Sequence, residues 1–339
     1  MKIAIHHTDS YGFFSERWIN YCINNNIEYK LVCAYDSNIV EQLKDCDAFM
    51  WHHSNYNFTD TLFAKQLVAS LETRGMKVFP NNNTTWHFDD KVGETYLLQA
   101  IDASLVPSYI FYSKSKALEW AKNTNFPKVF KLRGGSGSGN VRLVKSYFQA
   151  KKLINRAFGR GFSQFNGWQK LTLRFKEFLN GKESLFGVCK GIVRLFIGDE
   201  YSRLQHREKG YVYFQDFIPN NTFDIRICVV DNKAFALKRM CRENDFRASG
   251  GGRIIYDKNQ IDERCVKIAF DVNDKLKTQS IAFDFVFDEN NNPLIVEISY
   301  GYSANAYDAC EGYWTKDMQW HAGNNFDFCG WMVESLISK

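Results

Sequence analysis

The segment at residues 282–299, "AFDFVFDENNNPLIVEIS", contains two apolar strand-like runs joined by a polar, asparagine-rich turn. Turn-forming residues between two apolar runs predict a β-hairpin. Asp284 and Glu297 each lie inside one of the apolar runs, where burial of an unpaired carboxylate is costly. We therefore expect this hairpin to hold a positively charged partner.

That partner could be a metal ion or a set of arginines. Two carboxylates on adjacent strands, with the Ser299 hydroxyl two residues beyond Glu297, form an oxygen-only site of the kind that suits Mg²⁺, which keeps waters and takes phosphate oxygens as its other ligands. In the alternative, Asp284 and Glu297 pair with arginines such as Arg226 or Arg239 in a structural network. The local sequence leaves both interpretations open.

A glycine-rich loop lies upstream, in "KVFKLRGGSGSGNVRLV" at residues 128–144. Successive backbone N–H groups of such a loop can bind an anion, because glycine lets the chain approach a phosphate closely. Lys131, just before the loop, could add a positive charge. The loop matches neither the Walker A motif nor GxGxxG, since both open a helix and residues 141–144 read as a strand. Alone, it fits a flexible hairpin and a phosphate cradle equally well.

The first eighty residues alternate short apolar strands with amphipathic segments, which predicts a small parallel sheet covered by helices. A helix is expected to begin near Asp89, with Lys91 in its first turn. The rest of the chain divides into a part with the glycine-rich loop and a basic helical insertion, and a β-rich part with the hairpin and an aromatic tail. The expected domain boundaries are residues 1–88, 89–210 and 211–339.

Composition indicates a globular protein. The chain has 339 residues, 45% of them hydrophobic, and no apolar run approaches the roughly 18 residues of a membrane span. The N-terminus "MKIAIHHTDSYG" does not read as a signal peptide, so a cytoplasmic location is expected. Nine cysteines include no CxxC pair, which favours buried free thiols over zinc ligands or disulfides.

Positive charge is concentrated in one segment. Residues 145–212 contain 14 Lys and Arg but only five Asp and Glu, whereas the whole chain has a net charge of +5. The segment is either a solvated helical face or a surface that meets an acidic substrate. No nucleic-acid-binding motif accompanies the charge, which argues against nucleic acid as a partner.

The order of these motifs resembles the ATP-grasp superfamily, most closely the ribosomal-protein glutamate ligases and related carboxylate–amine ligases. The resemblance runs from about Asp90 to Ser299. It rests on "DDK" opening a helix, on the glycine-rich segment, on "FQDFI", on "KRMCRENDFRASGGG" and on the hairpin with "VEIS". It implies an α/β (α+β grasp) fold: an N-terminal parallel βαβ domain, then two α+β subdomains with the nucleotide between them.

The resemblance also implies roles for individual residues. Arg226, Arg239 and Arg247 would face the γ-phosphate and the acyl-phosphate, although each could instead be a surface charge. Asp284, Glu297 and Ser299 would hold one or two Mg²⁺ ions, with Mn²⁺ as a substitute. The residues that would bind ATP are Lys91, Lys131, the loop residues Gly134, Gly135, Ser136, Gly137, Ser138, Gly139 and Val141, and the hinge residues Gln215, Asp216, Phe217 and Ile218.

Two positions depart from the family pattern. Ser299 stands where the family usually has an asparagine ligand, and a hydroxyl is a weaker metal ligand than an amide oxygen. The acid that usually contacts the ribose has no clear counterpart, which leaves Asn221 or Asp224 as candidates. The serine keeps open a non-catalytic ATP-binding protein as an alternative to an enzyme.

By resemblance, the expected reaction is an ATP-dependent ligation of a carboxylate to an amine through an acyl-phosphate. A weaker likeness, in "VEISYGY" and "WHFDDK", is to a subgroup associated with surface-polysaccharide genes, which favours a small or carrier-linked acidic saccharide as the carboxylate substrate. The aromatic tail after residue 299 could stack on sugar rings or simply cap the core. A peptide ligase is the rival enzyme, a polyanion-binding scaffold is a third class, and a homodimer remains open.

Overall fold

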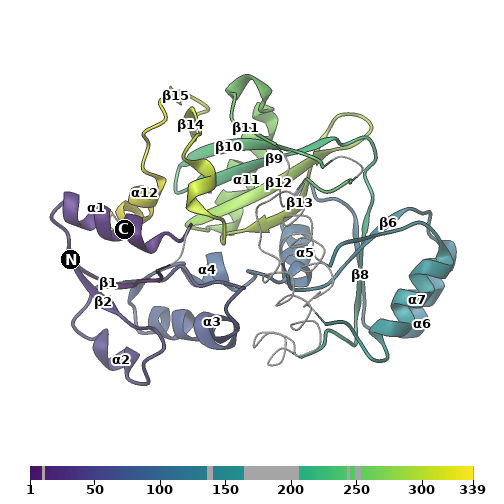
Figure 1. The fold of residues 1–339 in the computed structure, drawn as a ribbon, viewed down its shortest axis with the longest axis horizontal. Helices are drawn as coiled ribbons and strands as arrows, with labels where there is room; N and C mark the ends of the chain where they lie inside the picture. Colours follow the sequence, from purple (N-terminus) through teal and green to yellow (C-terminus); the bar gives the residue numbers. More distant parts are fainter. Residues whose placement is uncertain (10–11, 136–139, 164–205, 243–244, 249–252, 339) are drawn as a thin grey trace, which may run out of the picture.

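The computed structural model describes residues 1–9, 12–135, 140–163, 206–242, 245–248 and 253–338. It has a parallel sheet at the N-terminus and two antiparallel sheets after it (Figure 1). This is the mixed α/β architecture that the sequence predicted.

The N-terminal part is a four-stranded parallel sheet in the order β2-β1-β3-β4, the expected product of strands that alternate with helices. Its central strands β1 and β3 bury mainly apolar side chains, with His6 as the buried polar exception, and helix α3 begins at the Asn57 cap, whose side chain accepts from Thr59 N. Its elements are β1 (Lys2–His6), α1 (Ser15–Asn24), β2 (Glu28–Val32), α2 (Ile39–Gln42), β3 (Ala48–Met50), α3 (Phe58–Thr73), β4 (Lys77–Phe79) and α4 (Asn82–Thr85).

The central part begins with helix α5 (Lys91–Ala100). Asp90 caps it by accepting a hydrogen bond from Gly93 N at 3.0 Å, which confirms the predicted helix start. An antiparallel sheet follows in the order β5-β8-β6-β7, with α6 and α7 packed against it. Its elements are β5 (Ser108–Phe111), α6 (Lys114–Asn123), β6 (Lys128–Lys131), β7 (Arg142–Val144), α7 (Tyr147–Ala157) and β8 (Val212–Asp216).

Strand β8 lies in this central sheet, since it pairs with β5 and β6. The predicted boundary at residues 210 and 211 would assign β8 to the C-terminal subdomain. The strand pairing instead favours a change of subdomain after Asp216. The domain boundaries otherwise stay a prediction.

The C-terminal part is a larger antiparallel sheet in the order β13-β12-β9-β10-β14-β15, with β11 paired to β10. The predicted hairpin is its β12–β13 pair, in which Asp284 lies opposite Glu297. The elements are β9 (Phe223–Val230), β10 (Lys233–Met240), β11 (Ile254–Ile255), η1 (Lys258–Gln260), α11 (Glu263–Leu276), β12 (Ser280–Phe287), β13 (Pro293–Ser299), η2 (Ala304–Tyr307), β14 (Gly312–Thr315), β15 (Trp320–Ala322) and α12 (Phe328–Ile337).

The two faces of this sheet have different partners. One face packs on α11 through alternate apolar side chains of β9, β10 and β12. The other face is apolar at one end, where Cys228, Phe235 and Ala282 meet α1, α12 and the N-terminal sheet. Farther along the same face the side chains become charged, beginning with Arg226 and Asp284, which lie opposite one another on neighbouring strands. The charged end of this face is where a functional site can form.

The aromatic tail is largely core. Trp314 is fully buried against Trp320, while Trp331 packs against Tyr313 and Phe326. Both chain termini lie on the same side of the molecule, where α12 packs on α1 (Figure 1). The tail therefore joins the C-terminal sheet to the N-terminal domain. This arrangement agrees with a tail that caps the core, the alternative to a tail that stacks on sugar rings.

Two composition-based expectations can be compared with the described residues. Eight of the cysteines fall within them; all are free, and six are buried. No helix in the described ranges is long and apolar enough to cross a membrane.

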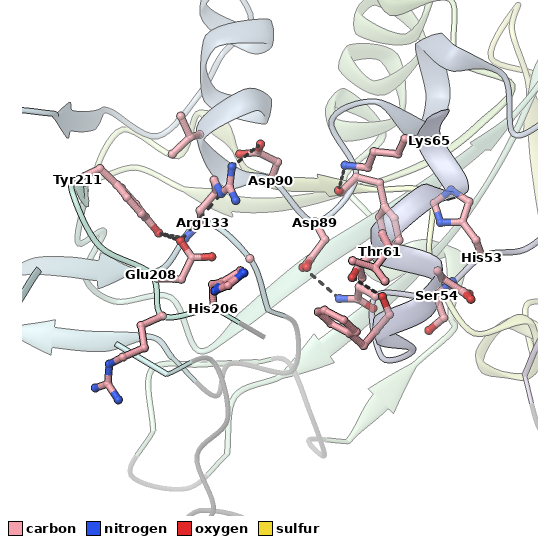
Figure 2. Close-up of a pocket in the computed structure, with 18 of the residues that line it drawn as sticks. His53, Ser54, Thr61, Lys65, Asp89, Asp90, Arg133, His206, Glu208 and Tyr211 are labelled. Atoms are coloured by element: carbon pink, nitrogen blue, oxygen red, sulfur yellow. Dashed lines mark hydrogen bonds and ion pairs between the residues drawn. The ribbon is translucent and has the colours of Figure 1, made fainter. Parts of the chain in front are cut away.

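A cavity of about 690 Å³ separates the N-terminal domain from the central part (Figure 2). One wall carries His53, Ser54, Thr61 and Lys65 from the end of β3 to α3, and the opposite wall carries residues of the 206–211 segment. The carboxyl ends of parallel strands are a common location for ligands. The cavity therefore becomes a candidate substrate site.

Candidate nucleotide and metal site

The charged end of the C-terminal sheet is organised by strand register. Arg226 on β9, Asp284 on β12 and Glu297 on β13 lie opposite one another on three adjacent strands, so their side chains share one face. Asp224 and Arg239 are paired one step farther along β9 and β10. The alternation of apolar and charged residues in these strands thus produces a compact charged cluster.

Asp284 is held by two arginines. Arg226 donates Nε to Oδ1 at 2.5 Å and Nη2 to Oδ2 at 2.7 Å, and Nη2 of Arg239 lies 2.9 Å from Oδ2. Burial alone would raise the pKa of Asp284, but the two guanidinium groups hold it well below its usual range. The arginine pairing considered as the alternative to a metal is therefore present for Asp284.

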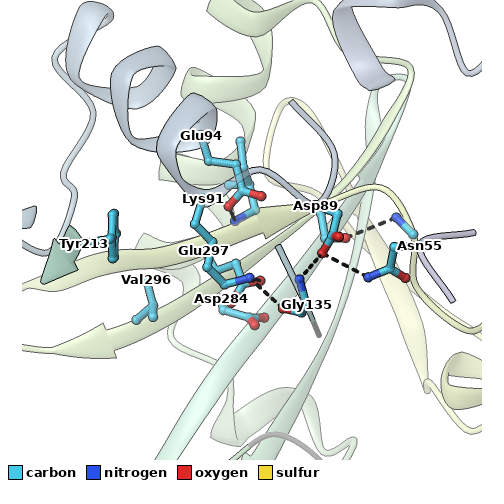
Figure 3. A network of polar contacts seen from close by, with 12 residues as sticks. Asn55, Asp89, Lys91, Glu94, Gly135, Tyr213, Asp284, Val296 and Glu297 are labelled. Carbon is cyan, nitrogen blue, oxygen red and sulfur yellow. Dashed lines mark hydrogen bonds and ion pairs between the residues drawn. The ribbon is translucent and has the colours of Figure 1, made fainter. Parts of the chain in front are cut away.

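Glu297 has a different cation partner. Lys91 Nζ lies 3.0 Å from Glu297 Oε1 and also donates to the Gly135 carbonyl at 2.9 Å (Figure 3). Burial alone would lower the pKa of Lys91, but Glu297, Glu94 and Asp89 outweigh it and raise the pKa above its usual value. Burial likewise opposes ionisation of Glu297, yet Lys91 and Lys131 keep the pKa of Glu297 below its usual value.

Lys131 at the end of β6 is the least stabilised cation of the site. It is 5% exposed, and burial lowers its pKa to about 8 although Glu297 opposes the shift. An incoming polyphosphate would supply the negative charge that this ammonium lacks.

A cavity between the central and C-terminal sheets contains many of the predicted residues. It is lined by apolar residues, among them Val106, Val129, Phe217 and Val286, and by charged residues, among them Lys131, Asp284 and Glu297. This polarity suits a nucleotide, whose base is flat and apolar and whose phosphates are anionic. The predicted residues that line this cavity are Lys131, Val141, Gln215, Asp216, Phe217, Ile218, Arg247, Asp284 and Glu297.

The hinge at residues 215–218 is fixed by side-chain contacts at its first two positions. Gln215 is buried and donates to Ser108 Oγ at 3.2 Å and to the Val296 carbonyl at 3.3 Å. Asp216 accepts from Lys128 on the neighbouring strand β6. These bonds position the following backbone against the cavity.

The loop is tied to the site from outside the predicted motif. Asp89 Oδ1 accepts from Gly135 N at 2.7 Å and from Asn55 Nδ2 at 3.0 Å (Figure 3). Asp89 adopts a left-handed conformation with φ of 56°, which aspartate tolerates better than most residues. Gly134 lines the larger cavity, while Ser136, Gly137, Ser138 and Gly139 lie outside the described residues.

The remaining predicted residues occupy different positions. Arg247 pairs with Asp245 two residues away, its Nη2 lying 2.6 Å from Asp245 Oδ2. Arg239 makes a bidentate pair with Asp224 at 2.7 and 2.6 Å in addition to its contact with Asp284. Ser299 lies opposite Ala282, and its Oγ accepts from Gly301 N at 3.2 Å.

Both candidate ribose contacts are already engaged. Asn221 Nδ2 donates to the Phe287 carbonyl at 2.9 Å, and its Oδ1 accepts from Phe287 N at 2.8 Å. Asp224 is the partner of Arg239. Both residues line the cavity between the central and C-terminal sheets, so the choice between them as the ribose contact stays open.

Glu94 was missed by the sequence reasoning. It is 4% exposed, and its Oε2 lies 3.5 Å from Ile298 N, next to Glu297. Burial, reinforced by the charge of Glu297, raises the pKa of Glu94 well above its usual value. Its spacing of three residues from Lys91 on the buried face of α5 is the signal that could have identified it.

The carboxylates at this site leave room for a cation. Three of the roughly four lone-pair positions of the Asp284 carboxylate are used by arginines, whereas among the described residues the Lys91 ammonium contacts only one oxygen of Glu297. Within the described ranges, no three His, Cys, Asp or Glu side chains cluster as a metal site, so the prediction rests on these two acids and Ser299. An ion that completes its shell with water and phosphate oxygens fits such a small ligand set.

Comparison with known proteins places this architecture in a class. Residues 190–309 match the family model of the RimK-like ATP-grasp domain. The matched range contains β9, β10 and the β12–β13 hairpin, so the charged end of the C-terminal sheet lies inside the part of the chain that is similar to the RimK-like ATP-grasp domain. None of the curated proteins compared with the sequence matches it.

Solved structures with the same fold span nearly the whole chain. A RimK domain ATP-grasp protein from Sphaerobacter thermophilus is 13% identical with a TM-score of 0.58, covering 99% of this chain and 100% of its own. The D-alanine–D-alanine ligase of Bacillus anthracis is 14% identical with a TM-score of 0.55, covering 100% and 98%. The biotin carboxylase domain of the Hydrogenobacter thermophilus 2-oxoglutarate carboxylase, solved with MgADP and bicarbonate, is 12% identical with a TM-score of 0.60, covering 100% and 70%. At these identities the likeness establishes the fold.

Proposed function

We propose that this protein is an ATP-dependent carboxylate–amine ligase that forms an amide or peptide bond through an acyl-phosphate. The observation that carries the proposal is the cavity between the two antiparallel sheets, whose lining combines apolar side chains with Lys131, Asp284 and Glu297. The ATP-grasp fold supports the choice of ATP as co-substrate.

Each group in the site has a place in this reaction. The hinge at residues 215–218 and the apolar side chains hold the adenine, while Lys91 and Lys131 hold the phosphates. Asp284 and Glu297 hold Mg²⁺, which supplies charge neutralisation for phosphoryl transfer when it is bound. Lys91 already contacts both Glu297 and the Gly135 carbonyl, so its ammonium lies between the hairpin acid and the glycine-rich loop.

The chemistry needs no nucleophile from the protein. A carboxylate oxygen of the substrate attacks the γ-phosphorus of ATP, the bond to the β,γ-bridging oxygen breaks, and ADP leaves. The amine nitrogen then attacks the acyl carbon, inorganic phosphate leaves, and the nitrogen loses a proton. The protein contributes position, positive charge from Arg226 and the lysines, and exclusion of water from the acyl-phosphate.

An acidic saccharide is the proposed carboxylate substrate. It is supported by the basic character of residues 145–212, of which Arg207 and Lys209 line the larger cavity. A peptide ligase is the second candidate, because the same cavity is large enough for a peptide terminus. Both candidate reactions use ATP in the same way and differ only in the substrates that are joined.

The test is release of ADP and phosphate with Mg²⁺ and ATP across a panel of uronic acids, amino acids, peptides and amines. We expect release that requires both a carboxylate and an amine and that is lost in Glu297→Gln. Glu289→Gln, on the exposed turn of the same hairpin, is the matched control and should retain turnover. Tight ATP binding without turnover across the panel would support the non-catalytic alternative.

A further inference from the structure

The cavity of about 690 Å³ is lined by acids and cations whose hydrogen-bond partners differ. Its acids are Asp60, Asp89, Asp90 and Glu208, and its cations include Lys65, Arg133, Arg207 and Lys209. Equal numbers of formal charges would suggest a neutral cavity. The hydrogen-bond partners of the two sets differ, and the partners decide what a ligand meets.

Each acid accepts hydrogen bonds from the protein. Asp60 accepts from Tyr35 Oη at 2.6 Å and Ser54 N at 2.7 Å, and Glu208 accepts from Tyr211 Oη at 2.8 Å. Asp89 holds Gly135 and Asn55, as described above, and Asp90 caps α5. These carboxylates are occupied in structural contacts.

Within the described part of the chain, Lys65 and Arg207 donate to backbone carbonyls, and Arg133 has only long ion pairs. Lys65 donates to the backbone carbonyls of Trp86 and Phe88 at 3.0 and 2.7 Å, and no described carboxylate lies within 4.0 Å of its Nζ. Arg133 lies 3.9 Å from both Asp90 and Glu208, beyond hydrogen-bond distance. Arg207 donates to the carbonyls of Arg160 and Gly161.

The two groups of cations lie on opposite walls. Lys65 lies on the α3 side with His53 and Thr61, whereas Arg133 lies on the other side with Glu208 and Tyr211 (Figure 2). A ligand that satisfies both walls needs an anionic group at each end. A ligand with one anionic group would leave the cation of one wall without a charge-assisted hydrogen bond to the ligand.

The cavity also adjoins the nucleotide site. Gly134 lines it, while Lys131 and Val141, on either side of the same glycine-rich loop, line the nucleotide cavity. The phosphate end of a nucleotide held by Lys131 would therefore lie beside this cavity. A carboxylate bound here would be close to the phosphate that it must attack.

We propose that this cavity binds the carboxylate substrate and selects a substrate that carries a second anionic group. Lys65 and Arg133, on opposite walls, hold the two anionic groups, one of which is the reacting carboxylate. A uronic acid that also carries a phosphate has this chemistry, whether the phosphate leads to a nucleotide or to a lipid. This inference rests on the ligase function proposed above.

The test is a binding measurement that needs no turnover. Glucuronic acid 1-phosphate, glucuronic acid and glucose 1-phosphate are titrated into the full chain by calorimetry, in the presence of Mg²⁺ and a non-hydrolysable ATP analogue. We expect the first probe to bind at least about tenfold more tightly than either of the others, because each lacks one charge-assisted contact. Equal affinities for the three probes would overturn the proposal.

Variants then separate the two walls. Lys65→Met and Arg133→Met should each weaken binding of glucuronic acid 1-phosphate by about tenfold while leaving affinity for the ATP analogue unchanged. Lys44→Met, at an exposed ion pair on the N-terminal domain, is the control and should bind like the unaltered protein. If Lys65→Met does not fold, Arg133→Met decides the matter, because its side chain is 54% exposed. Unchanged probe binding in Arg133→Met would overturn the proposal.

The outcomes also separate this inference from the proposed function. Binding of the doubly charged probe without ADP release in the presence of amines would support the cavity and count against the ligase. ADP release with acids that is insensitive to both cavity variants would support the ligase and overturn the cavity assignment. Competition between the probe and the ATP analogue would place the probe in the nucleotide site and also overturn it.

Discussion

Lys91 Nζ lies 3.0 Å from Oε1 of Glu297, which connects the first turn of α5 to strand β13 across the centre of the candidate site. The ammonium is almost fully buried and is surrounded by Glu297, Glu94 and Asp89. Three acids therefore raise the pKa of Lys91, and Glu297 is its direct ion-pair partner. Any phosphate that binds beside Lys91 competes with these carboxylates for the ammonium. Protein stability and nucleotide affinity should therefore depend on the charges of these groups.

Glu94 should make the unfolding free energy of the protein decrease as the pH rises above the unfolded-state pKa of this residue. Its pKa is raised in the folded protein, so its contribution to stability is greatest below 4.5 and is lost as the pH rises through the folded-state value. We expect the unfolding free energy of Glu94→Gln, relative to the unaltered protein, to increase between pH 5 and pH 7. Urea unfolding at several pH values measures it.

Glu119→Gln, on the exposed side of α6, is the control for this prediction and should show no such trend. Glu297 acts in a separate window, because its lowered pKa contributes stability that is lost only below 4.5. A constant difference between Glu94→Gln and the unaltered protein from pH 5 to 7 would contradict the assignment.

Lys131 should make nucleotide binding weaken at alkaline pH. Burial lowers its pKa to about 8, and phosphates bind the protonated form. Affinity for a Mg²⁺-bound ATP analogue is therefore expected to fall as the pH rises above 8, by about tenfold per pH unit at most. Calorimetry at pH 7, 8 and 9 provides the measurement.

Lys131→Arg is the matched variant, since a guanidinium stays protonated throughout this range. Its affinity should vary less between pH 7 and pH 9 than that of the unaltered protein. An identical alkaline loss in both proteins would show that a different group titrates.

Asp284 should be important for folding as well as for any metal. Replacing it with Asn removes the charge that neutralises Arg226 and Arg239, and breaking a buried ion pair on one side costs about 3–5 kcal/mol. Urea unfolding of Asp284→Asn should show a loss of this size. The double variant Asp284→Asn with Arg226→Met should recover part of it, because no uncompensated guanidinium remains at position 226.

A double-mutant cycle of Asp284→Asn and Arg226→Met isolates the coupling between the two residues. Additive effects would mean that the contact is energetically unimportant. Such a result would leave Asp284 available for a metal at no cost to stability.

Local sequence predicted much of the framework. The asparagine-rich turn and flanking apolar runs predicted the hairpin of β12 and β13, and the polar segment before residue 91 predicted a helix start near Asp89, where Asp90 caps α5. Asp284 and Glu297 could be identified because charged residues inside apolar strands need partners, and Lys131 because it directly precedes the glycine-rich loop. The structure brings all three to one cavity.

Long-range pairing was the part that local sequence could not provide. The partner of Glu297 is Lys91 and the partners of Asp284 are two arginines, and nothing in the hairpin distinguishes these arrangements. The place of β8 in the central sheet follows from pairing with β5 and β6, which lie far away in the sequence. The larger cavity escaped prediction for the same reason, since its walls come from separate segments.

Asp89 should couple the N-terminal domain to the glycine-rich loop. Its carboxylate accepts from both Asn55 Nδ2 and Gly135 N, and its left-handed backbone is tolerated by Gly and Asn. Asp89→Gly removes the carboxylate without backbone strain. We expect faster hydrogen exchange of the Gly135 amide and a severalfold weaker affinity for an ATP analogue, because the bonded loop end loses about 1.5–3 kcal/mol of charge-assisted bonding.

Asp89→Asn is the matched control, since its side-chain oxygen can still accept both hydrogen bonds in the same backbone conformation. Exchange at Gly135 should then lie close to that of the unaltered protein. If Asp89→Gly exchanged no faster than Asp89→Asn, the bond would not restrain the loop, and the contact between the two domains would be incidental. If only Asp89→Gly loosens the loop and weakens nucleotide binding, a residue outside the glycine-rich motif determines how well that motif is preorganised for phosphate.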